Sequence, residues 1–214
     1  MRKLSIFDEL INEVDQALRT VHTLAPTTER PNPSYDVSIE NKLSEEESKL
    51  SARLMRINHA GEVSAQGLYR GQALTAKRED IREQMERSAM EENDHLNWCE
   101  IRLEELDAHQ SYFGPVWYMG SFTIGAIAGL VGDKWSLGFV KETEDQVVRH
   151  LDEHIKKISQ KDAPSLAILQ QMKIDEAHHA DIAVEAGAAK LPLPIRKFLM
   201  PLMSKIMTKT AARI

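Results

Sequence analysis

Apolar residues recur at steps of three and four along most of the chain. Over residues 3–24 this spacing predicts an amphipathic helix. The same spacing predicts longer helices over three further ranges: 44–78, 79–109 and 123–160. Apolar and polar residues do not alternate over any sustained stretch, so no strand is predicted.

Capping signals mark where several of these helices begin. Ser44 followed by Glu47 forms a capping box, and Asp162 with Pro164 two residues later begins another helix, which ends near Gly187. Prolines make residues 25–43 a linker that is not expected to be helical. A basic helix over about 195–212 ends the chain, and Pro201 is expected to kink it.

The pattern therefore predicts an all-α fold, a four-helix bundle with an extra amphipathic helix at each end of the chain. We expect four segments along the sequence. They are an N-terminal helix (1–24), a proline-rich linker (25–43), the bundle (44–190) and a C-terminal basic amphipathic helix (191–214).

Glutamates and histidines stand inside the apolar stripes, where core residues are expected. An ExxH motif occurs twice, at Glu92–His95 and at Glu176–His179. Glu62 lies 30 residues before the first motif and Glu144 lies 32 residues before the second. The chain thus repeats the order of one glutamate, a turn and an ExxH helix. A single ExxH is a weak signal, but this repetition is specific.

The repeated pattern favours a site for two metal ions. Positions i and i+3 of a helix share one face, so each ExxH directs a carboxylate and an imidazole to the same point. Oxygen ligands with imidazole suit iron or manganese better than zinc. Four carboxylates also balance two divalent cations, whereas four unpaired carboxylates in a core would be very costly. The predicted metal ligands, which are also the predicted catalytic residues, are Glu62, Glu92, His95, Glu144, Glu176 and His179.

Neighbouring acids and histidines are assigned other places. We expect Glu91 to face away from the site, Glu142 to be solvated, and His178 to lie at the surface or just outside the ligands. His59 is either close to the site or structural, and His150 is a candidate for a position just outside the ligands. The remaining histidines are expected to face solvent: His22, His109 and His154.

Composition narrows the class of protein. The chain has 214 residues, a net charge of −6 and one cysteine, Cys99. An acidic chain is a poor nucleic-acid binder, so no nucleic-acid partner is expected. One cysteine excludes a disulfide framework and a multi-cysteine zinc site. Early acids interrupt any signal or transit peptide, which favours the cytoplasm.

Three sequence runs resemble the demethoxyubiquinone hydroxylases, a family of ferritin-like di-iron carboxylate proteins. The runs are LMRINHAGE at 54–62, EENDH at 91–95 and DEAHH at 175–179, and the resemblance covers about 50–190. It implies a ferritin-like bundle, two iron ions held by the same six residues, and a monooxygenase of ubiquinone biosynthesis. Such enzymes insert oxygen from O2 into the ring of a polyprenyl demethoxy-benzoquinone or quinol.

The chain departs from that family in places. Its first 40 residues lie outside the common core, and Leu151 stands where some members have a tyrosine. Arg53 resembles a family arginine near the site.

A polyprenyl quinone substrate requires access to a membrane. Residues 112–131 carry no charge and are long enough to span one. We expect this run either to be a buried connection between the bundle halves or to dip into lipid. Ser121, Gly125 and Gly129 would permit close helix packing or form a groove for the tail. After Glu185 the chain has bases and no acid, which favours a peripheral position on anionic lipid at the cytoplasmic face of the membrane, or else packing on the bundle or an oligomer contact.

The expected partners follow from the chemistry. No glycine-rich dinucleotide fingerprint follows a strand, so no nicotinamide or flavin domain is expected. The electrons for O2 would come from NADH, from a separate reductase or through the quinol itself. The chain is also expected to form a homo-oligomer or to join a biosynthetic complex. Two alternatives stay open: a ferroxidase or peroxidase of the ferritin or rubrerythrin type, although one cysteine excludes a rubrerythrin four-cysteine iron site, and a metal-free helical membrane adaptor.

Overall fold

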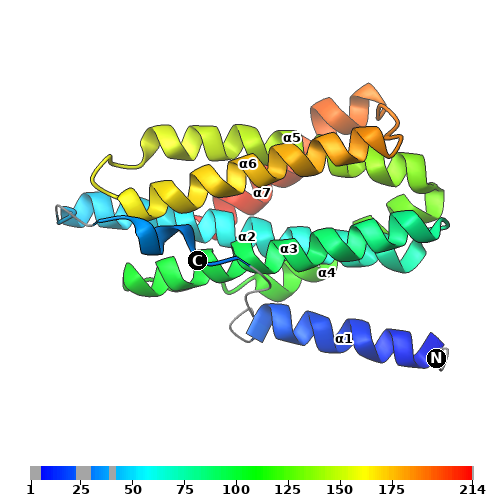
Figure 1. The fold of residues 1–214 in the computed structure, drawn as a ribbon, viewed down its shortest axis with the longest axis horizontal. Coiled ribbons are helices and arrows are strands. Elements are labelled where there is room, and N and C mark those ends of the chain that lie inside the picture. Colours follow the sequence, from blue (N-terminus) through cyan, green and yellow to red (C-terminus); the bar gives the residue numbers. More distant parts are fainter. Residues whose placement is uncertain (1–5, 23–29, 39–41, 214) are drawn as a thin grey trace.

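A computed structural model describes residues 6–22, 30–38 and 42–213, and every regular element in these ranges is helical (Figure 1). The bundle consists of four long helices: α2 (Glu45–Thr75), α3 (Glu79–Glu105), α5 (Asp133–Lys157) and α6 (Ala163–Glu185). Helices α2 and α3 lie side by side, and α5 and α6 form a second pair facing them. The predicted four-helix bundle of an all-α, ferritin-like protein is confirmed.

The remaining helices surround this bundle. They are α1 (Ile6–His22), the short 3-10 helix η1 (Pro33–Asp36), α4 (Gly114–Val131), the π-helical turn η2 (Ile195–Leu199) and α7 (Met200–Ala211). The linker prediction was wrong at η1, where Asn32 accepts a hydrogen bond from the Ser34 amide and caps the turn. The ends of the predicted helix 3–24 and linker residues 25–29 and 39–41 lie outside the described residues.

Local signals explain where the bundle helices begin and end. The capping box is confirmed, because Ser44 and Glu47 bond each other's backbone amides. Asp162 accepts from the Ser165 amide at 3.1 Å, as its predicted capping role requires. Helix α3 ends at Glu105, short of the predicted 109, and Asp107 follows with φ +51°, a left-handed conformation that no helix continues.

The predicted helix over 123–160 is wrong. Gly132 has φ +137°, which glycine adopts readily, and it separates α4 from α5. The run over 112–131 is not a buried connection either. Only four of the 18 residues of α4 are buried, and they are Gly114, Tyr118, Gly125 and Gly129.

Small residues let α4 lie directly on α2. A Cβ atom at Gly67 would stand 2.4 Å from the Tyr118 carbonyl oxygen, and one at Gly125 would stand 2.2 Å from the Leu68 carbonyl oxygen. The close packing expected from these glycines is therefore confirmed. By length and composition α4 is a candidate membrane span, a test that core helices also pass.

Two apolar clusters flank a polar layer in the bundle. One contains Met55, Trp98, Leu151 and Met172, and the other contains Tyr69, Met85, Val140 and Ala183. On every bundle helix the predicted site residues fall between a member of one cluster and a member of the other. The clusters thus fix the position of the glutamates and histidines along the bundle axis.

Candidate metal centre

The centre lies where four helices direct acids and imidazoles inward. Ligand-type atoms of Glu62 on α2, Glu92 and His95 on α3, and Glu176 on α6 all lie within 4.8 Å of one another. All four side chains are buried. Such a group has the donor set and the spacing to hold a metal ion.

The two histidines face the carboxylates through equivalent atoms. His95 Nδ1 lies 2.9 Å from Glu92 and 3.2 Å from Glu176. His179 Nδ1 lies 3.1 Å from Glu92 and 3.6 Å from Glu176. Glu92 and Glu176 therefore lie between the two imidazoles, where both could take part in holding metal.

Glu144 completes the set from α5. The Tyr69 hydroxyl donates a hydrogen bond of 2.7 Å to its Oε1 atom. Burial and then the Glu176 charge raise the pKa of Glu144. The structure thus brings together all six residues that the sequence singled out.

Several atoms of this cluster make no well-aligned hydrogen bond among the described residues, although His179 Nδ1 and Glu92 Oε1 lie only 3.1 Å apart. They are Glu62 Oε2, Glu92 Oε1, Glu176 Oε2 and His179 Nδ1. A buried polar atom without a partner costs about 1–3 kcal/mol, and more when charged. Four such atoms at one point fit a cation as the missing partner.

The pKa shifts of these residues reflect their burial and the closeness of their charges. Burial raises the pKa of Glu62, and the neighbouring Glu92 and Glu176 charges raise it further. Burial alone would lower the pKa of His95, but Glu92 and other nearby carboxylates raise it well above its ordinary value. Without cations the cluster holds protons, and metal ions would displace them.

A second ring of carboxylates orients the histidines. Asp175 on α6 accepts from His95 Nε2 at 2.9 Å, and Glu91 on α3 accepts from His179 Nε2 at 2.8 Å. The prediction that Glu91 faces away was wrong, because its long side chain reaches across to α6. Both acids directly precede a glutamate of an ExxH motif, and that repetition was the sequence signal for them.

Other predicted positions had mixed outcomes. His22, His109 and His178 are exposed, as expected, and Arg53 is exposed too. His59 is buried, 3.4 Å from Glu100, which is a structural role.

Two predictions of solvent exposure were wrong. His154 is buried and hydrogen-bonded to Asn58 at 2.8 Å. Glu142 is largely covered and lies 3.7 Å from Arg196 in the C-terminal segment. In both cases an element distant in sequence covers the side chain, which helical spacing alone does not reveal.

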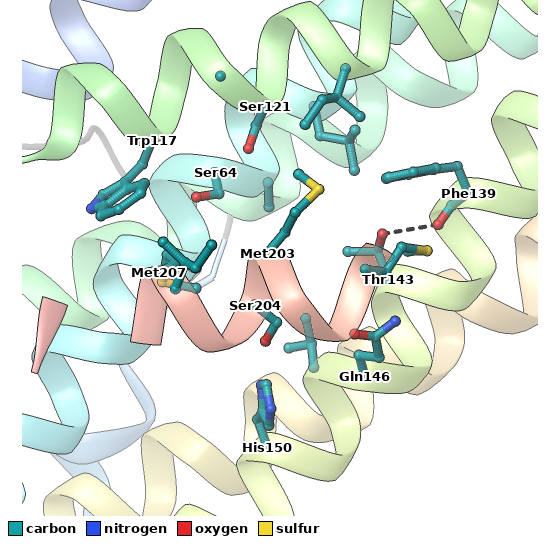
Figure 2. Close-up of a pocket in the computed structure, with 18 of the residues that line it drawn as sticks. Ser64, Trp117, Ser121, Phe139, Thr143, Gln146, His150, Met203, Ser204 and Met207 are labelled. Carbon is teal, nitrogen blue, oxygen red and sulfur yellow. Dashed lines mark hydrogen bonds between the residues drawn. The ribbon is translucent and has the colours of Figure 1, made fainter. Parts of the chain in front are cut away.

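An apolar cavity of about 360 Å³ is lined by residues that neighbour Glu62 and Glu144 in the sequence (Figure 2). Its walls come from α2, α4, α5 and α7, and they include Gly61 and Ala65 beside Glu62, and Thr143 and Val147 beside Glu144. Helix α7 runs across one side with Met203, Ser204 and Met207 turned inward. Polar groups in the lining are few: Ser64, Ser121, Thr143, Gln146, His150 and Ser204.

Comparisons with known proteins find relatives that match nearly the whole chain. The family model described as "Ubiquinone biosynthesis protein COQ7" matches residues 49–211. A protein of Nitrosococcus oceani named 3-demethoxyubiquinol 3-hydroxylase is 59% identical over 210 residues, covering 98% of this chain and 97% of that protein. Proteins of the same name from Ectopseudomonas mendocina and Acinetobacter baumannii are 53% and 49% identical, each over at least 98% of both chains.

Proposed function

Because the chain belongs to the family described as Ubiquinone biosynthesis protein COQ7, we propose that it catalyses the hydroxylation for which its relatives are named. The substrate is a demethoxyubiquinol, and the product is the ring-hydroxylated quinol of ubiquinone biosynthesis. The observation that carries this proposal is a buried carboxylate–histidine cluster in a bundle that also holds an apolar cavity, lined by neighbours in sequence of Glu62 and Glu144.

Two iron ions are the proposed cofactor. Glu62, Glu92, His95 and Glu176 would hold one ion, and Glu144 and His179 would hold the second together with the shared Glu92 and Glu176. Bound iron would supply the reductive activation of O2. The four carboxylates supply the charge that balances two divalent cations, and oxygen with imidazole ligands suits iron.

The protein's own contribution is a dry and fixed environment. The six side chains are at most 4% exposed, so bulk water is kept from the reacting atoms. Asp175, Glu91 and Tyr69 hold three of the six in place through hydrogen bonds. Such preorganisation favours oxygen transfer to the ring over release of reactive oxygen into solvent.

The cavity is the proposed site of the quinol. Its apolar walls suit a ring and the first part of a polyprenyl tail. Gln146 Nε2 is buried and makes no hydrogen bond within the described ranges, so it is a free donor for a ring oxygen. Thr143 is not free in the same way, because its Oγ1 already donates to the Phe139 carbonyl (Figure 2).

A membrane surface is the proposed source of the substrate. Helices α4 and α7 wall the cavity and also carry exposed apolar side chains, including Val116, Met119, Leu202 and Ile206. The C-terminal segment adds bases, including Arg196, Lys197, Lys205 and Lys209, which suit anionic lipid. We propose a peripheral position at the cytoplasmic face of the membrane, from which a quinol would enter between these helices.

The reaction needs an external reductant. One atom of O2 enters the ring and the other leaves as water, which consumes two electrons and two protons beyond those of the quinol C–H bond. NADH or a separate reductase is the proposed source.

Isotope labelling tests this function. Iron-loaded, reduced protein is given a demethoxyquinol and ¹⁸O₂, and the product is analysed by mass spectrometry. One labelled oxygen in the ring supports the proposal. Glu176→Gln serves as the control and should lose iron and turnover while it keeps its helix content. Consumption of O2 with an unchanged quinol would instead favour a ferroxidase or peroxidase.

A further inference from the structure

Arg30 joins the N-terminal segment to the two helices that carry the ExxH motifs. Its Nε atom donates to Asp94 on α3 at 3.1 Å, and its Nη1 atom donates to Asp175 on α6 at 2.6 Å. Its guanidinium also lies over the Trp98 ring, 5.1 Å from the centroid. Arg30 precedes the span 49–211 that the family model matches, so this contact is additional to the matched core.

The oxygen of Asp175 that Arg30 binds is the same one that His95 binds. His95 Nε2 donates to Oδ2 of Asp175 at 2.9 Å, while Gln171 donates to the other oxygen, Oδ1, at 2.9 Å. Three donors therefore fix the Asp175 carboxylate. With Nε2 held in this way, His95 directs Nδ1 toward Glu92 and Glu176.

A buried turn anchors the segment that carries Arg30. Asn32 is 2% exposed and caps η1 through the Ser34 amide. Helix η1 packs against α6, the helix of Asp175. Pro31 and Pro33 restrict the backbone on both sides of Asn32. Arg30 thus enters the bundle from a fixed position.

The other histidine offers an internal comparison. His179 Nε2 donates to Glu91, and Glu91 is bound by Arg87, four residues earlier on the same helix. That arginine is 48% exposed, and both partners belong to α3. Among the hydrogen bonds of the described residues, a residue of the N-terminal segment therefore binds the carboxylate that holds His95, but not the one that holds His179.

We propose that Arg30 is a positioning residue of the metal centre, and that it fixes the His95 imidazole for metal binding by way of Asp175. The inference rests on the proposed metal site. It makes the N-terminal segment a part of that site, through one guanidinium that spans α3 and α6.

Metal binding by the full chain tests the proposal without turnover. Fe²⁺ is titrated anaerobically against a competing chelator, and Co²⁺ is used as a spectroscopic probe of coordination. In Arg30→Met we expect one of the two metal ions to bind about ten- to a hundredfold more weakly, with a changed Co²⁺ spectrum. Arg30→Lys should recover part of this loss, because it keeps the charge but cannot bind both aspartates in the same way. Arg87→Met is the matched control and should have a smaller effect.

A double-mutant cycle separates positioning from general stability. If Arg30 acts through Asp175, Arg30→Met should add little to the loss caused by Asp175→Asn. Additive losses, or wild-type affinity and spectrum in Arg30→Met, would overturn the inference while leaving the metal site intact. Failure of the wild-type chain to bind either metal would overturn the proposed function as well. If Arg30→Met does not fold, the same cycle with Arg30→Lys decides.

Discussion

His179 on α6 donates a 2.8 Å hydrogen bond to Glu91 on α3, and this bond has a counterpart between His95 on α3 and Asp175 on α6. In each motif, the acid before the buried glutamate binds the histidine of the opposite motif. The two ExxH helices are thus cross-linked twice, with pseudo-twofold symmetry. This exchange fixes both imidazoles with Nδ1 facing the centre.

The His179 half of this arrangement can be tested with graded changes at Glu91. Glu91→Gln keeps an acceptor oxygen but loses its charge, and Glu91→Ala loses both. We expect iron affinity to fall in that order, by about tenfold or more for alanine, measured by chelator competition. Glu104→Ala, at an exposed position of the same helix, is the control. Equal affinity in all the variants would contradict the role of Glu91.

Tyr69 makes a comparable contact with Glu144. Burial and the nearby Glu144 charge raise the pKa of Tyr69, so its hydroxyl stays protonated and donates the 2.7 Å bond. Tyr69→Phe should lower the affinity for iron, or the turnover rate, by about ten- to a hundredfold. The ring still fills its place in the core, so the free energy of unfolding should change by only about 1 kcal/mol. Tyr112 is exposed, so Tyr112→Phe should leave iron affinity, turnover and the free energy of unfolding unchanged.

The sequence predicted the bundle and all six inward-facing residues because both depend on local periodicity. A helix fixes which positions share a face, and the repeated spacing of Glu62, Glu92, Glu144 and Glu176 carries that information. The contacts of Arg30 were not predictable in this way. They join residues 64 and 145 positions apart, and no local pattern encodes such a contact.

The main error in the fold has a single physical source. Helical spacing continues through Gly132 without a break, so 123–160 reads as one helix. The structure shows that the chain reverses there, and the φ of +137° is accessible because the residue is glycine. A lone glycine inside a helical pattern is compatible with both outcomes, and only the packing of α4 on α2 decides between them.

The close packing of α4 on α2 predicts opposite effects for two glycines of α4. Gly125→Ala would place a methyl group against the Leu68 carbonyl, and overpacking of this kind costs about 1–3 kcal/mol. At Gly120 no atom lies within 4 Å of the added methyl, so Gly120→Ala should stabilise the helix by up to about 1 kcal/mol. Urea unfolding of both variants measures the difference. A destabilised Gly120→Ala, or a neutral Gly125→Ala, would contradict this packing.

Burial of His154 predicts a loss of stability in mild acid. Burial, with smaller contributions from His150 and Lys157, lowers the pKa of His154 from 6.5 to about 4. Between these values the unfolded chain binds more protons than the folded one, so stability falls as the pH decreases through this window. The loss from pH 7 to pH 5 should be on the order of 1–2 kcal/mol. Urea unfolding at several pH values should show a flatter profile for His154→Gln, whereas His178→Gln, at an exposed position, should follow the wild type.

Gln146 offers a test of where the quinol ring binds. Gln146 lines the cavity two residues after Glu144 on α5, and its buried Nε2 has no hydrogen-bond partner in the described part of the chain. A ring oxygen that accepts from this donor would lose one hydrogen bond in Gln146→Leu, which corresponds to about a tenfold rise in KM. The metal ligands are untouched, so kcat and iron content should stay close to wild type. Steady-state kinetics with a short-tailed demethoxyquinol measures both parameters, and Thr123→Ala, at an exposed position of α4 that does not line the cavity, is the control. An unchanged KM, or a fall in kcat alone, would place the ring elsewhere in the cavity.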